Sequence, residues 1–147
     1  MPLPPDPFMQ VAIEEAELGL REGGIPIGSV LVRNGKIIGR GHNRRVQHGD
    51  PTSHAEIDCM RNAGRVKTYQ GTTLYSTLMP CYLCAGAIVQ FNIQGVVVGE
   101  DETFRGAKDF LESHGVEVTN MDSPECKEMM GEFIKAHPEL WNEDIGK

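Results

Sequence analysis

The sequence lacks long hydrophobic runs, low-complexity stretches and internal repeats. Its apolar segments, such as residues 27–32 and 96–98, are far shorter than the roughly 20 residues that span a membrane. Residues 1–8 are rich in proline and have no basic residue before an apolar stretch, a pattern unlike that of a secretory signal. We therefore expect a cytoplasmic protein with no membrane contact.

Positive charge is also scarce, with 14 Lys and Arg against 21 Asp and Glu and a net charge of -7. Proteins that bind nucleic acid usually present a basic face, and here the basic residues concentrate only in segments 40–45 and 61–67. This balance favours a small-molecule substrate over a nucleic acid. The 147 residues suffice for one domain, residues 1–147, and leave little room for a second.

Cysteine is rare as well, but two of the four cysteines stand in a chemically informative pattern. Cys81 and Cys84 form a Cys-x-x-Cys pair after Pro80, and His54 lies two residues before Glu56. A catalytic zinc takes three protein ligands and leaves one position for water. His54, Cys81 and Cys84 supply three ligands for one zinc per chain, so Glu56 remains free to move protons.

The spacing of these residues indicates how a fold can bring them together. The two sulfurs, three positions apart, share one face of a helix that Pro80 starts. His54 and Glu56 would point about 200° apart within a helix, so we place them in its first turn, with Ser53 as the cap. Two helix N-termini then face one ion, and their positive ends stabilise negative charge there.

Other interpretations of the cysteines stay open at this point. A Cys-x-x-Cys pair can be a redox pair, or with a distant histidine it can hold a structural zinc in a non-catalytic binding module. A structural zinc usually has four ligands, and Cys59 is the nearest candidate for the fourth. Cys59 lies among Ile57 and Met60, a setting typical of a packed core thiol, so we favour a catalytic zinc. We expect Cys126 to be a spectator thiol.

Hydrophobic periodicity and turn residues predict the secondary structure. A first helix begins at Asp6-Pro7 and ends before Gly23-Gly24, and Asn34-Gly35 joins two antiparallel strands. A strand, helix and strand in succession imply a parallel crossover, and hence a mixed sheet. The predicted strands are 27–33, 36–41, 72–77, 95–99 and 116–120, and the later helices are 54–62, 81–91, 104–114 and one from Ser123 to a break at Pro138.

Polar residues outside the cysteine and histidine motif give weaker signals. Asn43 is equally consistent with a turn at a strand end and with an amide that lines the site. Trp141 is typical of an anchor that packs the tail down. The remaining histidines lack ligand-like spacing, and we expect surface or packed positions for His42, His48, His114 and His137.

Four segments together carry a family resemblance. They are Gly41-His42-Asn43, His54-Ala55-Glu56, Pro80-Cys81-Tyr82-Leu83-Cys84 and the tail Trp141–Gly146. The pattern H-x-E…P-C-x-x-C is the signature of zinc-dependent nucleoside and nucleobase deaminases. With the other two segments, the chain resembles the fungal cytosine deaminases of the cytidine and deoxycytidylate deaminase superfamily over nearly its full length.

The resemblance implies an α/β protein with a three-layer α/β/α fold, a five-stranded mixed sheet and a homodimeric assembly. It also implies hydrolytic deamination of a free nucleobase, most directly cytosine to uracil and ammonia, with residues 138–147 as a C-terminal lid. The implied base contacts are the Asn43 amide, the backbone amides of Ala55 and Cys81, the aromatic walls Phe104 and Trp141, and the Asp144 carboxylate on the exocyclic amine.

Three residues depart from the fungal pattern. Ala55 replaces a glycine, Met79 a serine and Val46 a phenylalanine. We expect these changes to alter the pocket lining and to leave the zinc chemistry intact. Isocytosine, creatinine, guanine or a nucleoside therefore remain alternative substrates, and a tRNA adenosine is disfavoured by the acidic charge balance.

Overall fold

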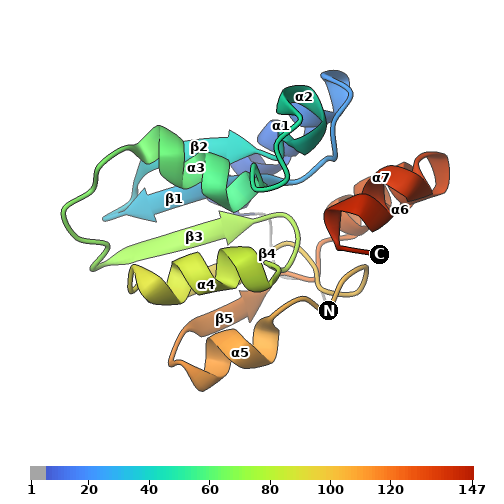
Figure 1. Ribbon diagram of the computed structural model, residues 1–147. Helices are drawn as coiled ribbons and strands as arrows, with labels where there is room; N and C mark the ends of the chain where they lie inside the picture. The colour runs from blue at the N-terminus through green and yellow to red at the C-terminus, as the bar shows by residue number, and fades with distance from the viewer. Residues whose placement is uncertain (1–5) are drawn as a thin grey trace.

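A computed structural model describes residues 6–147 and shows a five-stranded sheet between two layers of helices (Figure 1). The strand order is β2-β1-β3-β4-β5, with β1 antiparallel to β2 and β3, and β4 parallel to β3 and β5. The predicted mixed sheet is confirmed. The strands are β1 (Gly28–Arg33), β2 (Lys36–His42), β3 (Thr72–Ser76), β4 (Gly95–Val98) and β5 (Glu117–Asn120).

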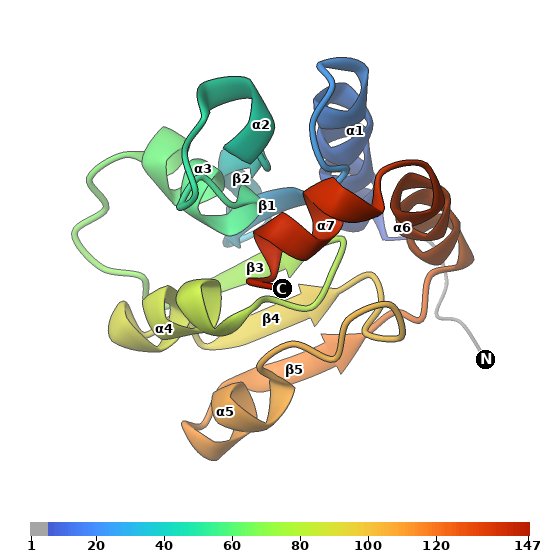
Figure 2. The same cartoon turned by 45° about the vertical axis from the view of Figure 1, so that its right-hand side comes forward.

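Each face of the sheet buries its own hydrophobic cluster. On one face, Leu31, Leu74 and Val96 pack against helices α3 (Ala55–Ala63), α4 (Tyr82–Gln90) and α5 (Lys108–Ser113). On the other, Val30 and Val32 pack against α1 (Pro7–Arg21) and α6 (Pro124–Ala136). Figure 2 shows these two layers on opposite sides of the sheet. The three-layer α/β/α architecture is thus confirmed.

Local sequence signals explain where several elements start and turn. The Asp6 carboxylate accepts hydrogen bonds from the Phe8 and Met9 amides, at 2.8 and 3.2 Å, and caps α1. Ser123 caps α6 in the same way through the Cys126 amide. Asn34 and Gly35 both have positive φ, as a two-residue hairpin turn requires. Among the described residues, no helix is long and apolar enough to cross a membrane.

Two local predictions are wrong. Ser53 does not cap α3, because His54 is the N-cap and the Ser53 hydroxyl has no hydrogen-bond partner in the described part of the chain. The helix expected at residues 104–114 begins only at Lys108. Gly106 holds a positive φ of 61° and the Ala107 amide donates to the Pro80 carbonyl at 2.9 Å, so the preceding residues form a turn instead.

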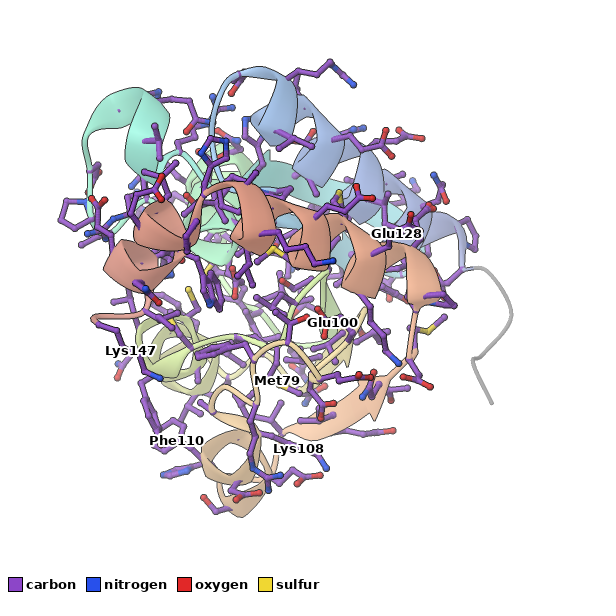
Figure 3. All side chains as sticks on the ribbon, turned by 90° about the vertical axis from the view of Figure 1, so that its right-hand side faces the viewer. Met79, Glu100, Lys108, Phe110, Glu128 and Lys147 are labelled. Atoms are coloured by element: carbon purple, nitrogen blue, oxygen red, sulfur yellow. The ribbon has the colours of Figure 1, made fainter. Side chains whose placement is uncertain are left out.

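The tail packs down as predicted, because Trp141 is buried in a hydrophobic cluster, and it also forms regular structure. Residues after the break at Pro138 form another helix, α7 (Pro138–Asp144). A short helix α2 (Arg45–His48) lies between β2 and α3. Figure 3 looks toward α6 and α7, which lie across the end of the sheet. The carboxyl ends of β3 and β4 lie at this end, where open α/β sheets usually bind ligands.

Candidate active site

The two halves of the histidine and cysteine motif meet because each begins a helix. His54 is the N-cap of α3 and Cys81 is the N-cap of α4, both in extended backbone conformation. Cys84 follows in the first turn of α4. The predicted meeting of two helix N-termini at one point is confirmed, although each helix starts one residue later than expected.

The three candidate ligands form a compact donor set. One donor atom from each of His54, Cys81 and Cys84 lies within 4.8 Å of the others. The Cys81 Sγ is 3.4 Å from the His54 Nδ1, and Cys84 is fully buried. Two sulfurs and one imidazole nitrogen match the donors that zinc prefers, so the residues present fit this metal.

The electrostatics of the donor set also favour a cation. Burial lowers the pKa of His54, but the Cys81 hydrogen bond and the charges of Asp144 and Glu56 outweigh it and raise that pKa to about 9. The same negative surroundings that retain a proton on His54 attract a divalent ion. A hydrogen bond from Cys84 lowers the pKa of Cys81 to about 4, and the same bond, together with burial, raises that of Cys84. A bound divalent ion would favour the thiolate form of both.

Glu56 lies beside this set without belonging to it. It occupies the first turn of α3, is 4 % exposed and lines the cavity next to His54 and Cys81. Burial, followed by the charge of Cys81, raises the pKa of Glu56 to about 7. A carboxyl group that gains and loses its proton near neutrality is suited to general acid and base catalysis.

Asn43 and Asp144 approach each other from opposite ends of the sequence. The Arg45 backbone amide donates to the Asn43 Oδ1 at 3.0 Å, which turns the amide nitrogen of Asn43 toward Asp144. That nitrogen donates to the Asp144 Oδ1 at 3.3 Å, and the same oxygen lies 3.7 Å from the His54 Nε2. A fixed donor and a fixed acceptor therefore face the cavity side by side.

Aromatic and aliphatic side chains form the rest of the cavity. The rings of Phe104 and Trp141 meet edge to face, with centroids 5.6 Å apart. Together with two of the candidate ligands and Glu56, these side chains line one small cavity. Met79, labelled in Figure 3, also lines the cavity. The full lining is Ile27, Asn43, His54, Glu56, Leu78, Met79, Cys81, Phe104, Trp141, Asp144 and Ile145.

Some residues singled out from the sequence lie outside this cavity. Cys59, a residue of α3, is fully buried in a core cluster and is not part of the donor set, so it does not serve as a fourth ligand. Cys126, a residue of α6, is likewise a buried core thiol. Val46 is exposed on α2 and does not line the cavity, contrary to expectation. The Ala55 side chain is buried, which leaves its backbone amide as the group available to a ligand.

Other contacts at the site were not predicted. Arg45 pairs with Glu143 at 3.3 Å and so ties α2 to α7. Ile27 and Ile145, which add apolar lining, come from the start of the sheet and the end of the chain. No motif marks these residues, because their meeting depends on how distant elements pack.

The chain is similar to proteins of one family. Residues 5–100 match the family model described as the cytidine and deoxycytidylate deaminase zinc-binding region. The chain is 44 % identical over 142 residues, 95 % of either chain, to the cytosine deaminase of Candida albicans. It is 36 % identical to the tRNA-specific adenosine deaminase of Haemophilus influenzae, over 90 % of this chain and 84 % of that one.

Solved structures of other proteins show the same fold. A structure from work on tRNA:A34 deaminases superposes with a TM-score of 0.72 at 31 % identity, covering 83 % of this chain and 97 % of the other. A guanine deaminase from Nitrosomonas europaea has a TM-score of 0.73 at 18 % identity, with 90 % and 87 % coverage. At that identity the likeness supports the fold alone.

Proposed function

Because the chain belongs to the cytidine and deoxycytidylate deaminase zinc-binding family, we propose that it deaminates free cytosine hydrolytically to uracil and ammonia. One observation carries the choice of reaction: Glu56, buried in the cavity wall, lies beside three zinc-type ligands without being one of them. The choice of cytosine is supported by 44 % identity, over nearly the full length, to a fungal cytosine deaminase.

The zinc of this family would be held by His54, Cys81 and Cys84. When bound, it supplies Lewis acidity that makes water a nucleophile near neutral pH. The N-termini of α3 and α4 point at the same place, and their partial positive charge stabilises an anion there. The protein around the ion therefore favours negative charge where the reaction develops it.

Glu56 would move the protons of the reaction. The carboxylate takes a proton from the attacking water as the water oxygen adds to the amine-bearing ring carbon. It delivers that proton to the adjacent ring nitrogen, then takes the remaining proton of the added hydroxyl group and passes it to the amine. Ammonia leaves, the carbon becomes a carbonyl, and Glu56 returns to its starting state.

The polar groups of the cavity match one edge of cytosine. The ring carbonyl of cytosine accepts hydrogen bonds and its exocyclic amine donates them. The Asn43 amide nitrogen presents a donor, and Asp144 presents an acceptor next to it. Burial raises the pKa of Asp144, and the nearby His54 charge and the Asn43 hydrogen bond oppose that shift. We assign Asn43 to the carbonyl and Asp144 to the amine, with the backbone amides of Ala55 and Cys81 as further contacts.

The substrate is tested by ammonia release from the zinc-loaded protein. The panel comprises cytosine, isocytosine, creatinine, guanine, cytidine and a tRNA with an adenosine at the wobble position. We expect cytosine to give the highest kcat/KM. A higher value for another member would replace cytosine by that substrate, and no ammonia from any of them would refute the catalytic interpretation in favour of a zinc-stabilised binding module.

Residues 138–147 would act as a lid that closes the cavity. They supply Trp141, Asp144 and Ile145 to the lining, and Glu143 fastens them to Arg45. Ending the chain at Pro138 removes an aromatic wall and a carboxylate, so we expect kcat/KM for cytosine to fall roughly 100-fold, the equivalent of two lost contacts of about 1.4 kcal/mol each. Zinc content, measured by atomic absorption, should stay unchanged.

Removal of Lys147 alone is the matched control for this truncation, since it leaves every lining residue in place. The control should retain wild-type kcat/KM. A chain ending at Pro138 that deaminates cytosine at the wild-type rate would show that these residues are not a lid.

We also propose a homodimer that forms through the outer face of α4. Tyr82, Leu83 and Phe91 leave 75 %, 45 % and 47 % of their surface exposed on and next to this helix. Exposed apolar side chains gathered on one helix are typical of an interaction surface. Tyr82→Glu should convert the dimer to a monomer in light scattering, and Leu20→Glu, at an exposed leucine of α1, should not. A dimeric Tyr82→Glu protein would place the interface elsewhere.

The donor set also supports a cytoplasmic location. Cys81 and Cys84 must stay reduced to bind zinc, and the cytoplasm keeps thiols reduced. Fractionation of cells that produce the protein would test this, and recovery from an oxidising compartment would contradict it.

A further inference from the structure

His42 lies behind the cavity in an unusual setting for a histidine outside the motif. Its side chain is fully buried at the end of β2. The ring Nδ1 is 2.8 Å from the Glu15 Oε1, and the ring Nε2 is 2.8 Å from the Glu22 Oε1. Glu15 belongs to α1 and Glu22 is the C-cap residue of that helix, two helical turns later, so both carboxylates reach the ring from α1 and its C-terminal cap.

This geometry specifies the protonation of the ring. An ionised carboxylate only accepts hydrogen bonds, so both nitrogens of His42 must carry a proton to satisfy both partners. The ring is then a buried imidazolium between two anions. The Glu15 hydrogen bond raises the pKa of His42 above its ordinary value, whereas burial acts against that change.

Further charged side chains surround His42, Glu15 and Glu22, and they come from the neighbouring elements. On the β2 side, the Arg40 Nε is 2.6 Å from the other Glu15 oxygen. Ahead of α2, Arg44 lies 3.9 Å from Glu22 and 3.0 Å from the Asp58 Oδ2 of α3. Three acids, two arginines and one histidine thus tie together α1, the end of β2 and α3.

Close packing leaves this arrangement little freedom. A Cβ added at Gly19 of α1 would lie 3.0 Å from the His42 ring, and one added at Gly41 would lie 2.6 Å from the Asp58 Oδ2. The same Asp58 oxygen accepts a hydrogen bond from the His42 backbone amide at 3.0 Å. Both the side chain and the main chain of His42 are therefore fixed by hydrogen bonds.

The residue that follows is Asn43, whose side chain reaches into the cavity. Its backbone amide donates to the Ile27 carbonyl at 3.0 Å, and its amide nitrogen donates to Asp144. We propose that His42 is a positioning residue, and that its ring anchors the end of β2 to α1 so that Asn43 presents its amide nitrogen to the substrate. The kinetic consequence rests on the proposed cytosine deamination.

His42→Gln tests this role, because glutamine cannot donate to both carboxylates in the same geometry. We expect KM for cytosine to rise roughly tenfold, the size of one weakened hydrogen bond, with kcat changed less than about threefold and zinc content unchanged. His48→Gln, at an exposed position of α2, is the matched control and should behave as the wild type. An unchanged KM in His42→Gln would overturn the proposal.

A double-mutant cycle separates positioning from a general loss of stability. If His42 acts through Asn43, His42→Gln should raise KM little in an Asn43→Ala background, whereas independent effects would multiply. Full multiplication of the two effects would overturn the proposal.

If His42→Gln fails to fold, Glu22→Gln offers a second test. It weakens the same anchor from a partly exposed side chain and should raise KM about threefold. An unchanged KM there would count against the proposal in the same way.

NMR gives a readout that does not depend on turnover. In the zinc-loaded protein at neutral pH, the His42 ring should show two protonated nitrogens, and the Asn43 side-chain amide signal should move in His42→Gln but not in His48→Gln. A singly protonated His42 ring, or an unmoved Asn43 signal, would overturn the proposal even if the protein used a substrate other than cytosine. Absence of cytosine turnover in the wild type would instead refute the proposed function.

Discussion

Replacement of Glu56 by glutamine should give a protein that binds zinc fully and deaminates cytosine about 10³-fold to 10⁴-fold more slowly. Glutamine keeps the size of the side chain but cannot accept and return a proton, and general acid and base catalysis contributes an effect of this order. Glu56 is buried in the cavity wall and outside the donor set, so its replacement leaves all three candidate zinc ligands in place.

Single-turnover ammonia release and zinc analysis of the same preparation measure this effect. Glu128→Gln, at an exposed position on α6 labelled in Figure 3, makes the same chemical change away from the cavity and should leave kcat unaltered. A Glu56→Gln protein with near-normal kcat would mean that another group carries the protons.

Replacement of Cys81 by alanine should remove both zinc and activity. Cys81 supplies a sulfur at the N-cap of α4, and two ligands alone bind the metal far more weakly than three. We expect zinc to fall from about one ion per chain to a small fraction of that, with a lower melting temperature, because metal bound only by the folded state stabilises that state.

Cys59→Ala distinguishes a three-ligand site from a closed four-ligand one. Cys59 points from α3 into the core, where burial raises its thiol pKa, and it is outside the donor set. Its replacement should cost some stability through the small cavity created and should leave the zinc content intact. Loss of zinc in Cys59→Ala would support a structural metal instead.

Much of the site could be predicted from sequence because its chemistry is local. Pro80, Cys81 and Cys84 specify a helix start with two sulfurs, and the spacing of His54 and Glu56 makes sense only at a helix end. The hairpin at Asn34-Gly35 likewise depends on residues that tolerate positive φ. Such features need no knowledge of the rest of the fold.

Features that depend on distant contacts could not be predicted in this way. The turn before α5 forms because Gly106 and Ala107 meet the Pro80 carbonyl, far away in the sequence. The role of His42 depends on carboxylates 27 and 20 positions earlier, one on α1 and one at its C-cap. Each of these residues has an ordinary local sequence, so only the packed structure reveals its partner.

The position of α7 at the end of the chain has a consequence for biosynthesis. A chain leaving the ribosome exposes His54, Cys81 and Cys84 before the residues of α7 have been made. The nascent chain therefore carries the complete donor set while it still lacks Trp141 and Asp144. Translation supplies the ion's ligands first and the residues that close the pocket last.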